Sequence, residues 1–267
     1  MVLAVQYLRL IKYPGSKFTI IPVIEEIFQT SGCGVLVDVF GGSGSVLLNV
    51  SSNMPVYNDI NSDLVSVFTI IKNKPLEFKS VLTKKISLLL NGKSENKVHN
   101  KKIIPDIKLQ NIEDAVSYVI SFSVSFGGMG RTYSTVKEKA YKAYLKRTLE
   151  TFDIISKNVS GWTIHNMDFR ELISRYDKPG TFFYFDPPYP GKVWYNYNFE
   201  ETDFVDLAKQ IKMIKGKYLL TLNSEDESLS DIFGDPTFIR SYENENGKKQ
   251  PDSKKYRYRA FYTNVKR

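Results

Sequence analysis

The sequence predicts an α/β fold built on a parallel sheet, with a mainly helical insertion. Short apolar runs alternate with amphipathic segments over residues 35–73, which is the strand–helix order of a parallel sheet. The pattern becomes polar and helical between about 75 and 160. Apolar strand-like runs then resume at Trp162–His165 and Thr181–Phe185. The chain therefore reads as one α/β domain interrupted in its middle.

The first half of the sheet can be followed from the N-terminal side. A helix from Pro22 to about Gln29 is expected to stop before Gly32 and Gly34. The elements expected next are a buried strand at 35–40, a helix at Ser45–Val50, a strand at Pro55–Asn58 and a helix from Ser62 to Asn73. Ser62 can cap that last helix, whose apolar face holds Leu64, Val67, Phe68 and Ile71.

The insertion begins near Pro75. A helix to about Leu90 leads into residues 91–111, where five lysines stand against two acids. Helices are expected at about 112–125 and 137–158, on either side of the glycine-rich stretch 126–133. The predicted division is a main domain of residues 1–72 and 160–267, with residues 73–159 inserted into it.

The second half of the sheet follows the insertion. Asp168 is a candidate N-cap for a short helix to Arg175. The expected elements after it are a buried strand at Thr181–Phe185, a helix at Phe204–Ile214, a strand at Tyr218–Leu222 and a hairpin of residues 237–242 and 256–263. The hairpin loop, 246–259, carries six basic residues against one aspartate.

Composition narrows the classes of function. The 267 residues carry a net charge of +8, which favours a polyanionic partner. The single cysteine, Cys33, excludes an internal disulfide and a cysteine zinc cluster, and two histidines argue against a histidine site, so no metal is expected. The apolar opening Met1–Tyr7 is too short for a signal sequence, and no stretch is long enough to span a bilayer. We expect a cytoplasmic protein without a membrane or obligate protein partner.

The tetrapeptide Asp186-Pro187-Pro188-Tyr189 directly follows a predicted buried strand. The prolines fix φ and lack N–H groups, so the turn is stiff and its carbonyls can accept hydrogen bonds. Asp186 adds a second acceptor and Tyr189 a ring for stacking. This combination suits a pocket that holds a flat base by its exocyclic amine; the alternative is a turn in which Asp186 merely ends the strand.

A glycine turn, Gly41-Gly42-Ser43-Gly44, follows the first predicted strand and its acid, Asp38. Glycines at a strand-to-helix turn let backbone N–H groups approach a ligand closely. The dinucleotide fingerprint requires a third glycine where Leu47 stands, so a pyrophosphate site is not favoured. An acid before the turn suits a ligand with an ammonium group. Asp59, just past the second strand, is placed to accept from a ribose diol.

Four segments occur in this order along the chain: Lys12–Lys17, Asp38–Ser45, Asn58–Leu64 and Asp186–Tyr189. Together they resemble the alpha group of DNA adenine-N6 methyltransferases, the Dam-like family. The resemblance implies a class I S-adenosylmethionine-dependent methyltransferase fold with a Rossmann-like sheet, and places the target-recognition domain at residues 73–159. It implies site-specific methylation of a flipped adenine in double-stranded DNA, as in restriction–modification, in a bacterial cell or a phage-infected host.

The resemblance also implies residue roles. Tyr13 and Lys17 match a motif that closes over S-adenosylmethionine. Asp38 should face the methionine ammonium, Asp59 the ribose hydroxyls and Asp168 the cofactor's adenine amine. The cofactor-binding residues expected in all are Tyr13, Lys17, Asp38, Phe40, Gly42, Gly44, Asp59, Asp168 and Asp186. Lys17 could instead be a surface lysine, and Asp168 only a helix cap.

The catalytic residues implied are Asp186 and Pro187, which accept both amine hydrogens of the base, and Tyr189, which stacks on it. The expected DNA contacts are Lys12, Arg131, Tyr133, Lys248, Lys249, Lys254 and Lys255. Further candidates for phosphate or base contacts are Lys97, Lys101, Lys102, Lys146 and Arg147. The stretch 126–133 lacks the Asn-Val-Pro that precedes the glycines in GATC-reading members, so no GATC specificity is assigned.

Four other functions are either still open or set aside. Cytosine-C5 methylation requires a cysteine nucleophile in the pocket. Cys33 precedes the first strand, far along the chain from Asp186, so this class is rejected. Cytosine-N4 methylation uses the same amine chemistry and remains open. A non-catalytic DNA-binding protein that kept the cofactor pocket is a further alternative, and a nucleotide-dependent oxidoreductase is disfavoured by Leu47.

Overall fold

The computed structural model of the chain describes residues 7–13, 15, 17–91, 109–125, 138–188, 199–223, 227–243 and 256–266. These residues group into two compact units. The helical unit comprises Met1–Phe18, Gly41–Ser51 and Asn61–Asn166. The sheet unit comprises Thr19–Phe40, Ser52–Ile60 and Met167–Arg267. The predicted insertion thus falls wholly within the helical unit.

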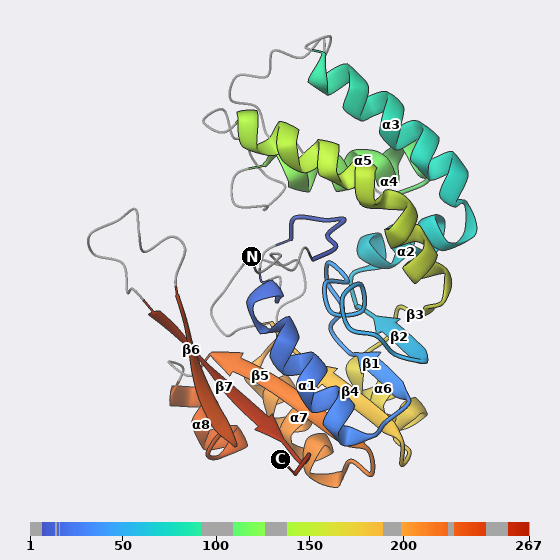
Figure 1. Cartoon of the computed structure of the whole chain (residues 1–267). Coiled ribbons are helices and arrows are strands. Elements are labelled where there is room, and N and C mark those ends of the chain that lie inside the picture. Colours follow the sequence, from blue (N-terminus) through green and yellow to red (C-terminus); the bar gives the residue numbers. More distant parts are fainter. Residues whose placement is uncertain are drawn as a thin grey trace. The chain divides into compact units, whose positions relative to one another are not determined.

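The sheet unit holds a mixed sheet with a parallel centre (Figure 1). Its strands are β1 (Val35–Asp38), β2 (Met54–Asn58), β4 (Thr181–Phe185), β5 (Lys217–Asn223), β6 (Phe238–Glu243) and β7 (Tyr256–Thr263). They lie in the order β2-β1-β4-β5-β7-β6. The pairs from β2 to β5 are parallel, whereas β7 runs antiparallel to both β5 and β6. The predicted parallel sheet and C-terminal hairpin are confirmed.

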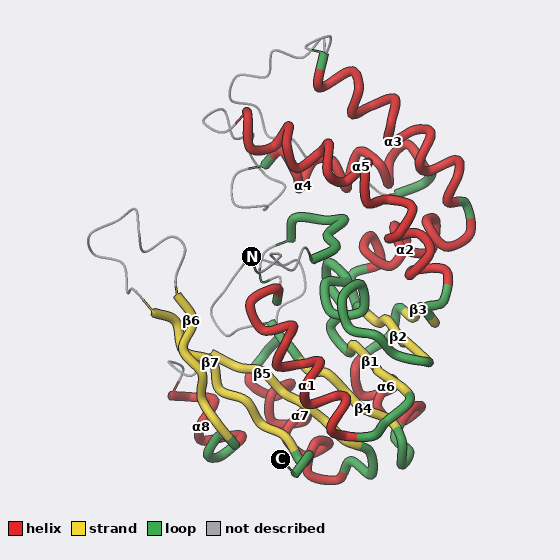
Figure 2. Tube along the Cα trace, viewed as in Figure 1, coloured by secondary structure: helices red, strands yellow, loops and turns green. Residues whose placement is uncertain are grey.

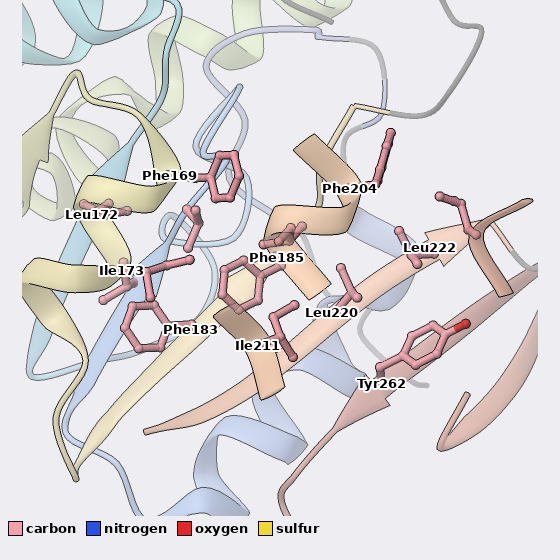
Figure 3. Packing of buried hydrophobic residues seen from close by; sticks show 14 of the residues in the cluster. Phe169, Leu172, Ile173, Phe183, Phe185, Phe204, Ile211, Leu220, Leu222 and Tyr262 are labelled. Carbon is pink, nitrogen blue, oxygen red and sulfur yellow. The ribbon is translucent and has the colours of Figure 1, made fainter. Parts of the chain in front are cut away.

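Helices cover both faces of this sheet. A short 3-10 turn, Phe18–Ile20, leads into α1 (Ile21–Ser31), which packs on one face through edge-to-face contact of Phe28 with Phe182. We call this side the α1 face. The opposite side, the α6–α8 face, is covered by α6 (Phe169–Tyr176), α7 (Glu201–Met213) and α8 (Glu227–Phe233). Its apolar cluster is drawn in Figure 3.

Strand alternation explains how one sheet serves both layers. Phe183 and Phe185 point into the cluster on the α6–α8 face, as do Leu220 and Leu222 of the neighbouring strand (Figure 3). Successive side chains of a strand point to opposite faces. Phe182 and Tyr184 therefore belong to the α1 face. All of these side chains are buried, as a parallel strand covered on both sides requires.

The helical unit contains four helices in its described part (Figure 2). They are α2 (Ser62–Asn73), α3 (Pro75–Leu90), α4 (Ile112–Val124) and α5 (Glu138–Ser160), followed by the short strand β3 (Thr163–His165). Phe78 of α3 stacks on Phe152 of α5 with ring centroids 5.5 Å apart. The mainly helical character expected of the insertion is confirmed for these residues. Among the described helices, none combines the length and apolarity needed to cross a membrane.

The predicted helix at Ser45–Val50 is wrong, because the segment forms a series of turns. The side-chain amide of Asn49 donates to the Ser45 carbonyl at 2.8 Å, which is the acceptor that an α-helix would offer to the Asn49 backbone. The Asn49 N–H bonds Val46 instead. Asn49 also exchanges two hydrogen bonds with the backbone of Leu8, so a distant contact overrides the local pattern.

Two smaller corrections concern helix starts. The N-cap of α2 is Asn61 rather than Ser62, since the Asn61 side chain accepts from the N–H of Asp63 at 3.0 Å. Helix α8 was not predicted. The spacing of Leu229, Ile232 and Phe233 gives it an apolar face, and that spacing was the available signal.

Gly44 is packed where no side chain fits. Its φ is +68°, and an added Cβ would lie 2.9 Å from both Phe68 Cζ and Trp162 Cη2. Those two rings are themselves in contact, with centroids 5.1 Å apart. The glycine turn is thereby seated directly on the aromatic core of the helical unit.

We expect Gly44→Ala to lower the free energy of unfolding by about 2–4 kcal/mol, the sum of a positive-φ cost and overpacking. Chemical denaturation measures this loss. Gly32→Ala is the matched control, because Gly32 has φ +66° with open space around it and should lose only about 1 kcal/mol. Equal losses in the two variants would refute the packing argument.

Candidate active site

Three of the predicted acids lie at one edge of the sheet unit. Asp38 ends β1, Asp59 directly follows β2 and Asp186 directly follows β4. Both neighbours of β1 run parallel to it, so the carboxyl ends of these strands meet at the same edge. Asp38 is in register with Tyr184, which puts the Cα atoms of Asp38 and Asp186 about 8 Å apart on strand geometry.

The acids differ in exposure. Asp38 is 1% exposed, whereas Asp59 and Asp186 are half-buried. A carboxylate shielded from water interacts more strongly with a cation or donor placed against it than an exposed carboxylate does. A buried acid flanked by two partly accessible ones suits a ligand that presents an ammonium group and several hydroxyl or amine donors.

Aromatic rings border the end of β1. Phe40 contacts the rings of Phe169, Phe185 and Phe199, and its centroid lies 5.3 Å from that of Phe199 in an edge-to-face arrangement. Phe199 also contacts Phe169 and Phe204. Phe40 is half-buried, so these contacts hold the ring in place while leaving part of it accessible. Sequence reasoning singled out Phe40 and missed Phe199.

Asp168 caps α6, as predicted. Its Oδ1 accepts from the N–H of Arg170 at 2.8 Å, and its carboxylate forms an ion pair with the Arg170 guanidinium. Arg170 also binds Asp203 and Asp206 of α7. The hydrogen bond to Asp203, then those to Asp206 and Asp168, raise the pKa of Arg170 above its ordinary value despite partial desolvation. The contact of Asp168 with a cofactor amine stays a prediction.

The remaining cofactor candidates belong to the helical unit. Gly42 and Gly44 both have positive φ, as the glycine turn requires. The ring of Tyr13 packs against Phe122 of α4. Lys17 is 3% exposed and its ammonium donates to the Gly15 carbonyl at 2.7 Å, so the alternative of a surface lysine is wrong.

The DNA candidates are only partly visible. Lys12 is half-buried, and Arg147 donates to the carbonyl of Tyr7, so its guanidinium helps to hold the N-terminal segment. Lys146 lies exposed on α5. The other DNA candidates fall outside the described residues, namely Lys97, Lys101, Lys102, Arg131, Tyr133, Lys248, Lys249, Lys254 and Lys255. The catalytic candidate Tyr189 also falls outside them.

Comparison with known proteins identifies the family of this site. Residues 13–248 match the sequence profile of the D12 class N6 adenine-specific DNA methyltransferases. The chain belongs to this family. Membership confirms the resemblance drawn from the four motifs, and with it an enzyme that methylates N6 of adenine in DNA. Methyltransferases of this family use S-adenosylmethionine.

Curated relatives agree. A type II methyltransferase of Lactococcus lactis subsp. cremoris, M1.LlaDCHI, is 24% identical over an alignment of 249 residues that covers 84% of this chain and 84% of that protein. The DNA adenine methylase of Escherichia coli K12 is 35% identical over 68 residues, 26% of this chain and 24% of that protein. The DNA adenine methylase of Serratia marcescens is 32% identical over 68 residues, 26% of this chain and 24% of that protein.

Asn58 braces the acidic edge of this adenine methyltransferase. It is 1% exposed, and its amide donates to the carbonyls of Val39 and Met167 at 3.0 and 3.1 Å. Its oxygen accepts from the N–H of Met167 at 3.1 Å. One side chain on β2 thereby ties the end of β1 to the segment that leads into Asp168. Sequence reasoning missed this role, which a polar residue at the end of a buried strand could have signalled.

We expect Asn58→Asp to lower the free energy of unfolding by about 3–5 kcal/mol, because a buried carboxylate would face two carbonyl oxygens. Asn264→Asp is the matched control. Asn264 makes the same kind of bonds, from Tyr218 N–H and to the Gly216 carbonyl, but is exposed to water. Its loss should stay below about 1 kcal/mol. Chemical denaturation of both variants decides; a small loss at residue 58 contradicts the bracing role.

Proposed function

We propose that this methyltransferase holds the N6 amine of an adenine between Asp186 and the Pro187 carbonyl, and that double-stranded DNA supplies the base. The observation that carries the proposal is the common edge of the parallel strands β1 and β4, where Asp38 ends β1 and Asp186 directly follows β4. Pro187 is buried, and the rings of Pro187 and Pro188 fix φ, so the turn that presents both acceptors is stiff.

The sheet-unit residues fit S-adenosylmethionine as the methyl donor. Asp38 would pair with the methionine ammonium, Asp59 with the ribose hydroxyls, and the accessible part of the Phe40 ring with an apolar portion of the cofactor. Asp168 is engaged by Arg170, yet a carboxylate has about four acceptor sites and can still accept from an adenine amine. The roles implied for Tyr13, Lys17, Gly42 and Gly44 remain predictions.

The protein's own contribution to the reaction is positioning. S-adenosylmethionine supplies a methyl group that is already activated by the positive sulfur. The adenine amine is a poor nucleophile, because its lone pair is delocalised into the ring. Asp186 and the Pro187 carbonyl accept hydrogen bonds from its two N–H groups. These bonds favour a pyramidal nitrogen and stabilise the positive charge that develops there. Alignment of two bound reactants lowers the barrier by about 7–11 kcal/mol.

The target base must leave the duplex, which costs a few kcal/mol. Stacking on Tyr189 is expected to return about 1–3 kcal/mol. Residues 73–159 are proposed as the target-recognition domain, in which basic side chains contact phosphates and bases. The type II relative from Lactococcus supports a role as the modification enzyme of a restriction–modification system.

Asp186→Ala is expected to reduce methyl transfer at least about a hundredfold, since it removes an acceptor that acts in the transition state. The assay is transfer of labelled methyl groups from S-adenosylmethionine to duplex DNA. Asp153→Ala is the control, because Asp153 is a carboxylate of α5 whose side chain is 71% accessible. Thermal denaturation must show both variants folded. Near-normal turnover of Asp186→Ala would refute the proposed site.

The base and the reaction are tested on the same product. Digestion of the labelled DNA to nucleosides should yield labelled N6-methyldeoxyadenosine. Methyl groups on N4 of cytosine would overturn the choice of base. Cofactor binding without transfer to any duplex would instead support the non-catalytic alternative.

A further inference from the structure

We infer that Thr221, on β5, is a positioning residue for Asp186 and that Tyr184 supports it from β4. The inference rests on the proposed function of Asp186. Thr221 Oγ1 lies 3.3 Å from Asp186 Oδ1 and 3.0 Å from the Tyr184 hydroxyl. Its third neighbour is the Phe185 carbonyl at 3.4 Å. Thr221 and Tyr184 are 0% and 1% exposed, so these contacts are shielded from water.

Strand register brings these groups together. Phe185 pairs with Leu220 in the parallel ladder between β4 and β5, so Thr221 lies beside the residue after Phe185, which is Asp186. Leu220 and Leu222 point into the cluster on the α6–α8 face (Figure 3), and Thr221 between them points to the α1 face, as Tyr184 does. Two buried hydroxyls are costly unless they are hydrogen-bonded.

The direction of the hydrogen bonds follows from the tyrosine. Burial first, then the charges of Asp186 and Asp38, raise the pKa of Tyr184 well above its ordinary value, and the hydrogen bond with Thr221 and the charge of Arg259 offset them only in part. Tyr184 therefore keeps its proton and can donate to Thr221. Thr221 has one hydroxyl hydrogen and donates it in a hydrogen bond to Asp186, because a carboxylate is a stronger acceptor than the nearby Phe185 carbonyl.

For the reaction, the hydrogen bond from Thr221 would fix the orientation of the Asp186 carboxylate. A hydrogen bond to Oδ1 restrains rotation of the Asp186 carboxyl group about its side-chain bonds. A carboxylate restrained at one oxygen presents the other in a defined direction, and catalytic groups must be held within about 0.5 Å and 10–20° of the productive geometry. A variant in which Asp186 lacks this hydrogen bond should carry out the chemical step more slowly but bind substrate and cofactor as well as the wild type does.

Thr221→Val removes the hydroxyl at nearly constant volume. We expect it to lower the single-turnover rate of methyl transfer about 10–100-fold, with dissociation constants for S-adenosylmethionine and duplex DNA within about twofold of wild type. Thr221→Ser restores the hydroxyl and should recover most of the rate. Tyr184→Phe keeps Thr221 but removes the donor behind it, and should lower the rate less than Thr221→Val does.

The outcomes are separable. An unchanged rate in Thr221→Val, or a loss that Thr221→Ser shares, overturns the positioning role; so does a loss that appears only in the dissociation constants. Asp186→Ala is run in the same assay. If it is inactive while Thr221→Val is fully active, only the present inference fails. If Asp186→Ala is active, the proposed site fails, and the inference fails with it. Should Thr221→Val not fold, the comparison of Tyr184→Phe with wild type decides.

Discussion

The parallel pairing of β1 with β4 is the constraint on which the candidate site depends. The N–H of Val39 donates to the Tyr184 carbonyl at 3.1 Å, so the ladder continues beyond the last residue of β1. Two acids that are far apart in the chain, Asp38 and Asp186, are thereby held at one edge by backbone hydrogen bonds. A site organised in this way does not rely on long flexible side chains to bring its charges together.

Neutral polar side chains brace this edge from behind. Asn58 ties β2 to the end of β1, and Thr221 contacts Asp186 from β5. Both are almost fully buried, where an unsatisfied polar group is costly, so their geometry is set by their partners. The charged brace, Arg170, lies nearer to solvent and joins Asp168 to α7. The two buried braces are thus neutral, while the ion pairs of Arg170 occupy the more accessible rim, where desolvation costs less.

Much of the fold could be predicted because the signals were local. The strand at Thr181–Phe185 was predicted with its observed bounds, since four consecutive aromatic residues between Thr181 and Asp186 indicate a buried strand. The helix predicted at Ser45–Val50 is wrong for the opposite reason, because a distant contact decides its structure. Its helical pattern is local, but Asn49 takes the Ser45 carbonyl and binds Leu8, and no pattern within six residues reveals a partner forty-one positions away.

The sequence by itself determined the family, the acids and the stiff turn, because motifs such as Asp186–Tyr189 carry their chemistry in residue type and order. Only the tertiary structure decided which side chains hold those acids. Asn58 and Thr221 are ordinary strand residues in the sequence, and their roles arise from pairing with chain segments that lie far away. Only the tertiary structure showed, too, that Lys17 is not a surface lysine, because the sequence gives the charge of a lysine but not its burial.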